Sequence, residues 1–253
     1  DNLEAFVQKP TKTRPIPCHF CDLCNYNDYC RTELKNAKSI FELPYATKLQ
    51  EERLRGAGIL SLDDLSASPP RPTSITPKTY ESLVKRAQLR LPRLGGGEAS
   101  FEYVGPGPSS NKIELIPASS DHDIFFDIEG DPFVDGGLEY LFGLLMGPKE
   151  TDEFIDIWSH TSLEEKEATR RTISILYETC LANKDAHIYH YNAYEVNALR
   201  KLSQKYEVLE DQLDALLRAN RFIDLYPITT RNIVTSEKGI SLKDLEVFFL
   251  QGN

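Results

Sequence analysis

The stretch FFDIEGDPF, residues 125–133, places two carboxylates two residues apart inside an apolar run. Side chains on a strand alternate between faces, so Asp127 and Glu129 share one face, about 6.6 Å apart along the chain. Two carboxylates at this spacing can reach metal ions set about 3.5–4 Å apart, an arrangement that supports phosphodiester cleavage. We therefore predict a site for two Mg²⁺ or Mn²⁺ ions, because these hard cations select oxygen ligands.

A metal site of this kind needs a third acid, and the segment HIYHYNAYEVNALRKL, residues 187–202, supplies Glu195 where a strand runs into a helix. Two alternatives are weighed against this reading. Glu195 could simply offset the dipole at the helix start, which is worth roughly a few tenths of a kcal/mol. The stretch from Asp121 to Tyr140 contains seven acids and no Lys or Arg, and these acids could form a solvated loop beside the strand.

Four of the five cysteines lie in CHFCDLCNYNDYC, with the spacing C-x2-C-x2-C-x5-C. Thiols this close in a cytoplasmic protein are more typical of a metal site than of disulfides. Zinc sites usually pair two C-x2-C knuckles across a longer loop, so the compact spacing favours an iron–sulfur cluster. We predict metal binding at Cys18, Cys21, Cys24 and Cys30; zinc, or a cysteine set that has lost its metal, are the alternatives.

The elements that must position these residues change character along the chain. Residues 35–94 read as helical and slightly basic, and the Gly-, Pro- and Ser-rich text LGGGEASFEYVGPGPSSN reads as a boundary, within which SFEYV could pair with KIELIP. Beyond it the pattern predicts strands and helices, with Ser162 as a helix N-cap three residues before Glu165. The predicted strands are residues 124–128, 140–146, 153–158 and 186–191, and the predicted helices are 162–181, 196–205 and 209–221. The fold class is therefore α/β, with an RNase H-like mixed sheet and flanking helices after a small all-helical domain and a cysteine-rich segment.

Composition sets limits on partners and compartment. The 253 residues are 40% hydrophobic and 27% charged, and no apolar run approaches the ~20 residues of a membrane span. Without a signal peptide, a cytoplasmic protein with no membrane partner is expected. The net charge is −10, so nucleic acid would be bound only where metal ions offset the acids. The chain starts at Asp rather than Met and ends in LEVFFLQGN, so we expect a fragment of a longer protein.

Two motifs resemble those of the DEDD exonucleases, which have an RNase H-like fold. FFDIEG resembles their first motif, and HYNAYE aligns without a gap to their second motif, H-N-A-x-F-D, with Tyr191, Asn192 and Glu195 as the departures. FIDLYPI and GISLKDLEVFF resemble the segments that follow. The resemblance implies that Asp127, Glu129 and Glu195 are catalytic metal ligands, that His190 and Asn192 contact nucleic acid, and that the fourth acid lies beyond Asn253.

The subset C-x2-C-x5-C of the cysteine segment resembles the C-terminal cysteines of RecB-type nucleases, which hold a [4Fe–4S] cluster. The text LRGAGILSLDDLSA is similar to the helical region of predicted RecB-like nucleases and to a helix-hairpin-helix, which implies phosphate contacts by Arg53 and Arg55. The alternative is that its glycines only cap one helix and turn into the next. The predicted domains are residues 1–34, a RecB-type tail; 35–95, helical; 96–118, a linker; and 119–253, an incomplete RNase H-like domain.

The order of these motifs along the chain indicates a RecB-like nuclease with a DEDD-type 3′→5′ exonuclease domain. Its implied partners are DNA or RNA, an upstream RecB-like nuclease module in the same chain and a helicase. A noncatalytic RNase H-like module that positions nucleic acid or a partner is the alternative function. An acidic protein-interaction domain with a structural zinc knuckle is the third.

Overall fold

The structure is a computed structural model that describes residue 4 and residues 7–9, 13–104, 116–148 and 151–249. The chain divides into two compact units. We call Asp1–Tyr103 with Ile233–Asn253 the helical unit, and Val104–Asn232 the sheet unit. The division is one of packing, so the domain boundaries proposed from the sequence stay predictions. Among the described residues, no helix combines the length and apolar character needed to span a membrane.

The sheet unit is built on a five-stranded mixed sheet with the order β4-β3-β2-β5-β6. Strand β3 is antiparallel to both β2 and β4, whereas β5 runs parallel to β2 and β6 parallel to β5. The strands are β2 (Ile124–Asp131), β3 (Leu138–Met146), β4 (Glu153–Trp158), β5 (Ile188–His190) and β6 (Phe222–Asp224). The predicted α/β fold class with a mixed sheet is therefore confirmed.

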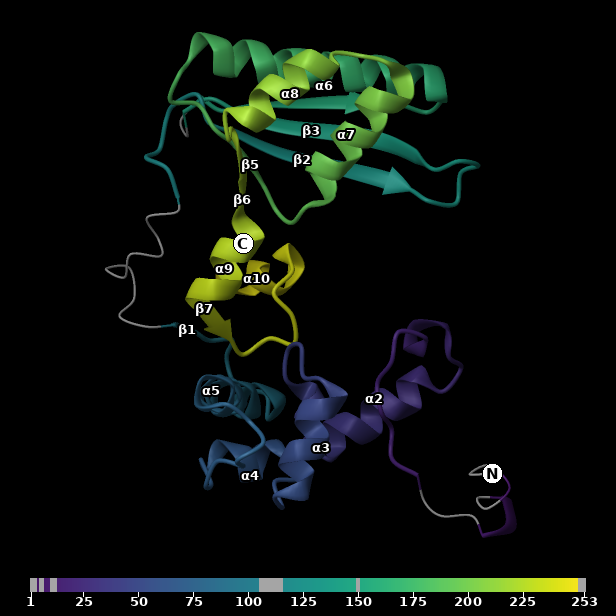
Figure 1. Cartoon of the computed structure of the whole chain (residues 1–253), viewed down its shortest axis with the longest axis vertical. Coiled ribbons are helices and arrows are strands. Elements are labelled where there is room, and N and C mark those ends of the chain that lie inside the picture. The colour runs from purple at the N-terminus through teal and green to yellow at the C-terminus, as the bar shows by residue number, and fades with distance from the viewer. Residues whose placement is uncertain (1–3, 5–6, 10–12, 105–115, 149–150, 250–253) are drawn as a thin grey trace. The chain divides into compact units, whose positions relative to one another are not determined.

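Three helices cover one face of this sheet: α6 (Ser162–Ala182), α7 (Tyr194–Tyr206) and α8 (Glu210–Arg218) (Figure 1). Apolar side chains of β2 alternate with exposed ones, and its buried set belongs to the core shared with these helices: Ile124, Phe126 and Ile128. Asp127 and Glu129 lie on the opposite face, as the period of a strand requires. The predicted alternation of β2 is confirmed.

The start of α6 differs from the prediction by one residue. Ser162 is already inside the helix, and Thr161 is the N-cap, with its side chain accepting from the N–H of Glu164. Thr161 has the extended backbone, φ −139° and ψ 159°, that an N-cap residue adopts, and either hydroxyl residue can serve this role. The sequence pattern Thr-Ser therefore located the helix start without fixing which residue caps it.

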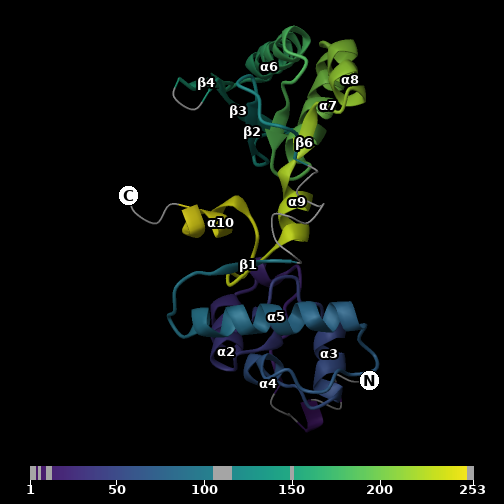
Figure 2. The ribbon, with the colours of Figure 1, turned by 90° about the vertical axis from the view of Figure 1, so that its left-hand side faces the viewer.

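The helical unit has a separate core formed by short helices. They are η1 (Cys21–Leu23), α2 (Asn27–Asn36), η2 (Ile40–Glu42), α3 (Lys48–Gly56), α4 (Leu62–Ser66) and α5 (Pro77–Leu94). In this unit α5 lies between α4 and the two-stranded pair of β1 (Phe101–Tyr103) and β7 (Ile233–Thr235) (Figure 2). Helix α9 (Leu225–Asn232) belongs to the sheet unit and α10 (Leu242–Phe249) to the helical unit.

The described partner of β1 differs from the strand expected from the sequence. SFEYV was predicted to pair with KIELIP, but Phe101 and Tyr103 pair antiparallel with Thr235 and Ile233. Residues 112–115 of the expected partner lie outside the described residues. A three-residue strand has little local signal for its partner, and here the partner lies more than 100 residues further along the chain. Only the packed structure identifies it.

Candidate functional site

The sheet topology brings two of the three predicted acids together. Because β5 runs parallel beside β2, the chain that leaves β5 begins α7 close to the end of β2. Asp127 on β2 and Glu195 in the first turn of α7 share a hydrogen bond between their carboxyl groups. Glu129, exposed on the same face of β2 as Asp127, adds its charge to this pair.

The electrostatics of Asp127 reflect this crowding. The pKa of this carboxyl is raised to about 6, first by burial, then by the charges of Glu195 and Glu129 and by the hydrogen bond to Glu195. Asp127 as a residue is exposed on the sheet, but its carboxyl meets the buried Glu195, so partial desolvation is the largest cause. Perturbed carboxyl groups of this kind cluster at functional sites.

Glu195 is buried without a cation. Its exposed fraction is 4%, and its Oε2 has no hydrogen-bond partner in the described part of the chain. The ring Nδ1 of His190 lies 3.5 Å from this oxygen, but it is hydrogen-bonded at 2.6 Å to the carbonyl oxygen of Asn192. An unsatisfied buried carboxylate costs several kcal/mol in a folded protein, so a cation at this position would relieve an existing penalty.

The donor set fits a divalent ion of the Mg²⁺ class. Asp127, Glu129 and Glu195 offer only carboxylate oxygens, and one buried oxygen has no other partner. As they stand, no three His, Cys, Asp or Glu side chains in the described ranges are grouped closely enough to hold one metal ion. Like charges favour separated carboxylates, so closure around an ion would require side-chain rotation. The residues are suitable for the ion, although the geometry of a bound site is not formed.

Asp224 fixes the loop that carries Glu195. Its Oδ1 accepts the N–H groups of Asn192 and Tyr226, both at 2.9 Å. Asn192 has φ +78°, a left-handed backbone that Asn tolerates better than most residues. Asp224 pairs with His190 in the parallel register of β5 and β6, which places the acid beside the loop. The sequence matched Asp224 to a family segment but gave no role for it.

His190 and Asn192 were predicted to contact nucleic acid, and they differ in access. His190 is 5% exposed, and its ring is bound to the main chain of the loop. Asn192 is exposed, and its side-chain oxygen accepts from the N–H of Ala193. The structure therefore places His190 under the loop and Asn192 on its surface, and the nucleic-acid role of both stays a prediction.

Two side chains that sequence reasoning missed meet at the end of β2. The hydroxyl of Tyr194 donates to Oε2 of Glu139 at 2.8 Å. The pKa of Tyr194 is raised by burial first, and then by the hydrogen bond to Glu139 and the charges of Glu139, Glu129 and Glu195. No local pattern links residues 139 and 194. A glycine in a strand often marks a point where other groups approach the backbone closely, so Gly130, directly after Glu129, was a signal for this contact.

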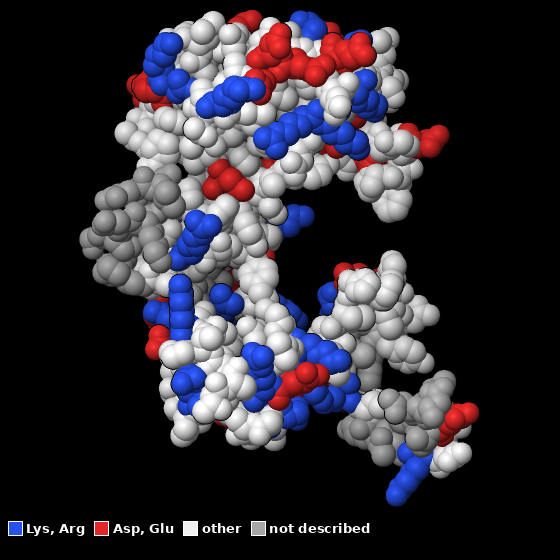
Figure 3. Space-filling view, in the orientation of Figure 1, with Lys and Arg blue, Asp and Glu red and all other residues white. Residues whose placement is uncertain are grey.

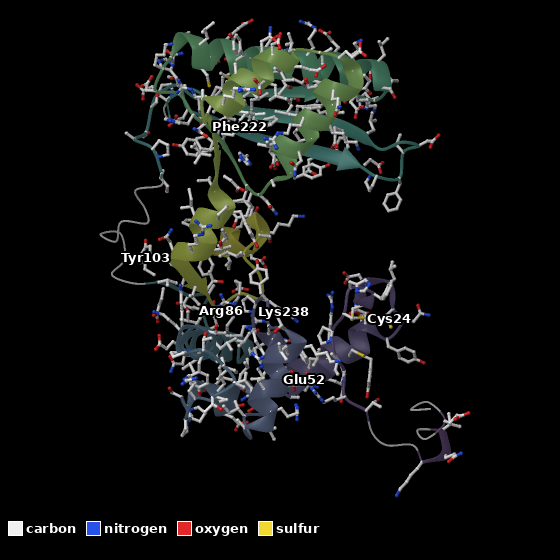
Figure 4. All side chains as sticks on the ribbon, viewed as in Figure 1. Cys24, Glu52, Arg86, Tyr103, Phe222 and Lys238 are labelled. Atoms are coloured by element: carbon white, nitrogen blue, oxygen red, sulfur yellow. The ribbon has the colours of Figure 1, made fainter. Side chains whose placement is uncertain are left out.

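The cysteines are only partly assembled. Cys21 begins η1, Cys24 follows it as the C-cap (Figure 4), and Cys30 lies in α2. The sulfur atoms of Cys18 and Cys21 are 4.0 Å apart, and the N–H of Cys18 donates to Sγ of Cys21 at 3.2 Å. All four thiols are free. The structure brings two of them together, and metal binding by the four stays a prediction.

A pocket of about 360 Å³ adjoins this segment. Its lining includes Cys18, Cys21 and Cys30, together with the cationic side chains of Arg31 and Lys238. Lys238 also pairs with the buried Glu42 at 3.0 Å. Arg31 is paired at 2.9 Å with Asp22, which also lines the pocket, so both cations of the lining are balanced by acids.

Arg53 and Arg55 have different environments. Arg55 is paired at 2.7 Å with Glu51, which is buried at 1% exposure, whereas Arg53 is exposed in the same helix. Lys and Arg side chains are spread over the visible face of the helical unit in Figure 3. Arg53 is therefore better placed than Arg55 for an electrostatic contact with phosphate, and both contacts stay predictions.

The glycine turn after α3 is closed by its own main chain. The N–H of Ile59 donates to the carbonyl of Leu54, and the N–H of Gly58 donates to that of Arg55. Gly58 has φ +82°, and Ile59 and Leu54 both belong to the core of the helical unit. This pattern is a Schellman helix ending, so the structure favours the capping interpretation over phosphate binding by the glycine turn.

Comparisons with known proteins agree with the fold. A family model of the RNase H superfamily matches residues 124–252, which is just over half of the chain. The chain therefore belongs to the RNase H superfamily. No curated protein and no solved structure gives a significant match. Membership supports activity of the nuclease type, nucleic acid as the partner, and the Mg²⁺ or Mn²⁺ ions that such folds usually use.

Proposed function

We propose that the sheet unit carries a metal-dependent nuclease site that hydrolyses phosphodiester bonds of DNA or RNA from the 3′ end. The observation that carries the proposal is the buried Glu195 carboxylate, which meets Asp127 and has an oxygen without a partner among the described residues. A chain with no use for an ion at this point would gain stability from a neutral residue there. Membership of the RNase H superfamily supports the same reading.

Each acid has a distinct part in this proposal. Asp127 and Glu129, on one face of β2, would hold two divalent ions together with Glu195 from α7. Bound ions of this class activate a water molecule and stabilise the leaving oxygen in phosphodiester cleavage. Asp224 and His190 would act indirectly, because they hold the loop from which α7 starts.

The test uses the full-length protein on 5′-end-labelled single-stranded DNA and RNA with Mn²⁺. We expect stepwise shortening that stops with EDTA and falls by roughly a thousandfold in Asp127→Asn, the cost expected when several kcal/mol of transition-state stabilisation are lost. Glu153→Gln on β4 is the matched control, because Glu153 is an exposed acid of the same sheet outside the site. It should cleave at the wild-type rate.

The alternative function is a noncatalytic module that positions nucleic acid or a partner for an upstream nuclease. The same experiment separates the two. If Asp127→Asn and wild type cleave equally, the chemistry belongs elsewhere and the sheet unit serves as a scaffold. Binding of the labelled strands that persists in EDTA would then support the scaffold.

For the cysteine segment we propose an iron–sulfur cluster held by Cys18, Cys21, Cys24 and Cys30, with zinc as the alternative. Three of these thiols, Cys18, Cys21 and Cys30, line one pocket, which supports a ligand that they share. Protein purified without oxygen should be brown and contain iron and sulfide. A colourless protein with one equivalent of zinc would support the alternative, and a metal-free protein would contradict both.

A further inference from the structure

The end of β2 has a space that only glycine leaves open. The pairing of β2 with β3 is irregular between Glu129 and Gly130. A Cβ at residue 130 would lie 2.2 Å from Oε2 of Glu139 and 2.5 Å from the hydroxyl of Tyr194. Both atoms are the ends of flexible side chains, so a larger residue would displace the carboxylate or the hydroxyl, and the missing Cβ is what allows them to meet here.

The contact in this space is a hydrogen bond of fixed direction. The Tyr194 hydroxyl donates to Oε2 of Glu139 at 2.8 Å. Glu129 and Glu195 also act on this hydroxyl electrostatically, which places it among the carboxylates of the proposed metal site.

Both ends of the bond are anchored, but to different parts of the sheet unit. The N–H of Glu139 on β3 donates to the buried Glu165 of α6 at 2.6 Å. Tyr194 is the first residue of α7, directly before Glu195, and the N-cap residue Ala193 makes no side-chain bond. The hydroxyl of Tyr194 therefore ties the otherwise uncapped first turn of α7 to β3, across the end of β2.

We propose that Tyr194 and Glu139 are positioning residues that hold Glu195 against Asp127, with Gly130 as the space they require. This inference rests on the proposed metal site. Glu139 acts through Tyr194 and α7 rather than by touching a metal ion. Because Tyr194 and Glu195 are neighbours in one helical turn, loss of the bond should let the Glu195 carboxylate move away from Asp127.

The experiment measures Mn²⁺ affinity by calorimetric titration and, separately, amide hydrogen exchange in the first turn of α7 with EDTA present. Tyr194→Phe removes only the donor. We expect binding weaker by roughly 10- to 100-fold, the usual effect of losing a partner that orients a metal ligand. Glu139→Ala should weaken binding equally. Tyr177→Phe is the matched control, because Tyr177 packs on the core of the same unit from α6.

Glu139→Gln distinguishes positioning from direct ligation. Gln keeps an oxygen that accepts from Tyr194 but loses the charge, so positioning predicts binding close to that of wild type and direct ligation predicts a loss like that of Glu139→Ala. The exchange rate of Asn197, whose N–H donates to the carbonyl of Ala193 at 3.1 Å, should rise in Tyr194→Phe and Glu139→Ala only.

The outcomes separate the tether from the proposed metal site. Wild-type affinity in Tyr194→Phe, or a loss in Glu139→Gln as large as in Glu139→Ala, would overturn the inference. Failure of wild type to bind Mn²⁺ would overturn the proposed function instead. In that case, unchanged exchange in Tyr194→Phe would also overturn the tether, and faster exchange would support it.

Discussion

The helical unit and the sheet unit both bury glutamates, but they compensate the charge in different ways. In the helical unit, Glu51 is 1% exposed and receives two bonds from Arg14, at 2.6 and 2.8 Å, and one from Arg55. Glu42 is 3% exposed and is paired with Arg90 and Lys238. Each of these buried acids therefore has two cations.

In the sheet unit, Glu195 is as deeply buried, yet it meets a second acid and is paired with no Lys or Arg among the described residues. The difference is not a general property of the unit, because the equally buried Glu165 accepts from Lys205, Tyr206 and the N–H of Glu139. The fold therefore gives Glu51, Glu42 and Glu165 cationic partners, but in the described part of the chain it gives none to Glu195 and Asp127, which we call the acid pair. This difference supports the proposal that a bound divalent ion supplies the compensating charge.

The largest expected effect concerns the buried Glu42 of the helical unit, whose charge is paired with two cations. Arg90→Met leaves Glu42 buried with Lys238 alone, and should lower the free energy of unfolding by about 3 kcal/mol, measured by urea denaturation. The double variant Glu42→Leu with Arg90→Met should recover most of this loss, because no charge is then buried unpaired. A single variant as stable as wild type would contradict the account of this pair.

Removal of a charge from the acid pair should raise the free energy of unfolding rather than lower it. Glu195→Gln removes an uncompensated buried charge, so the metal-free protein should become more stable by roughly 1–2 kcal/mol while losing Mn²⁺ binding. Glu165→Gln is the matched control and should be destabilised, because its charge is fully paired. Both are measured by urea denaturation in EDTA. If both variants lose stability, the two glutamates are alike and the comparison fails.

The pH dependence of stability gives a smaller effect. The pKa of Asp127 is raised to about 6 in the folded state from an ordinary 3.8, so the folded state holds this proton more tightly than the unfolded state. Its contribution to stability is present below about pH 4 and is lost as the pH rises through about 6. After allowance for solvent screening the loss is about 1 kcal/mol.

Asp127→Asn isolates this contribution. The unfolding free energy of Asp127→Asn minus that of wild type, measured in EDTA, should grow from pH 4 to pH 7. Saturating Mn²⁺ should stabilise wild type at pH 7 and leave the variant unchanged, because an ion that binds only the folded state shifts the equilibrium toward it. A difference that is constant with pH would show that the pKa of Asp127 is not raised in the folded state.

The smallest effect concerns the helical unit. Gly58→Ala keeps the turn after α3 free of clashes but imposes a side chain at φ +82°, so stability should fall by roughly 0.5–1 kcal/mol. Because the N–H groups of this turn are bound within the chain, affinity for nucleic acid should not change. A loss of affinity with unchanged stability would instead support a phosphate contact at the turn.

The sequence predicted β2, β3 and β4 well, because each is an apolar-rich run bounded by turn residues, and β2 also shows a clear period of two. The acids Asp127 and Glu129 were found by the same period. Strand β6 and the pair of β1 with β7 were not predicted, since three residues carry too little pattern to identify a partner.

The site could be predicted only where its residues form a local motif. Glu195 follows a recognisable strand–helix boundary, but Tyr194 and Glu139 lie in segments 55 residues apart and meet through the space left by Gly130. Asp224 likewise acts on a loop 32 residues away. Contacts of this kind depend on sheet order and register, which the spacing of residues along the chain does not contain.

We propose that Asp127, Glu129 and Glu195 hold divalent metal. The most direct measurement is anomalous scattering from a crystal of the protein grown with Mn²⁺. The account predicts two peaks beside Asp127, Glu129 and Glu195, roughly 3.5–4 Å apart, with the Glu195 oxygen now bound. Crystals with Mn²⁺ bound elsewhere and none at these carboxylates, at pH 7 where Asp127 is ionised, would contradict it.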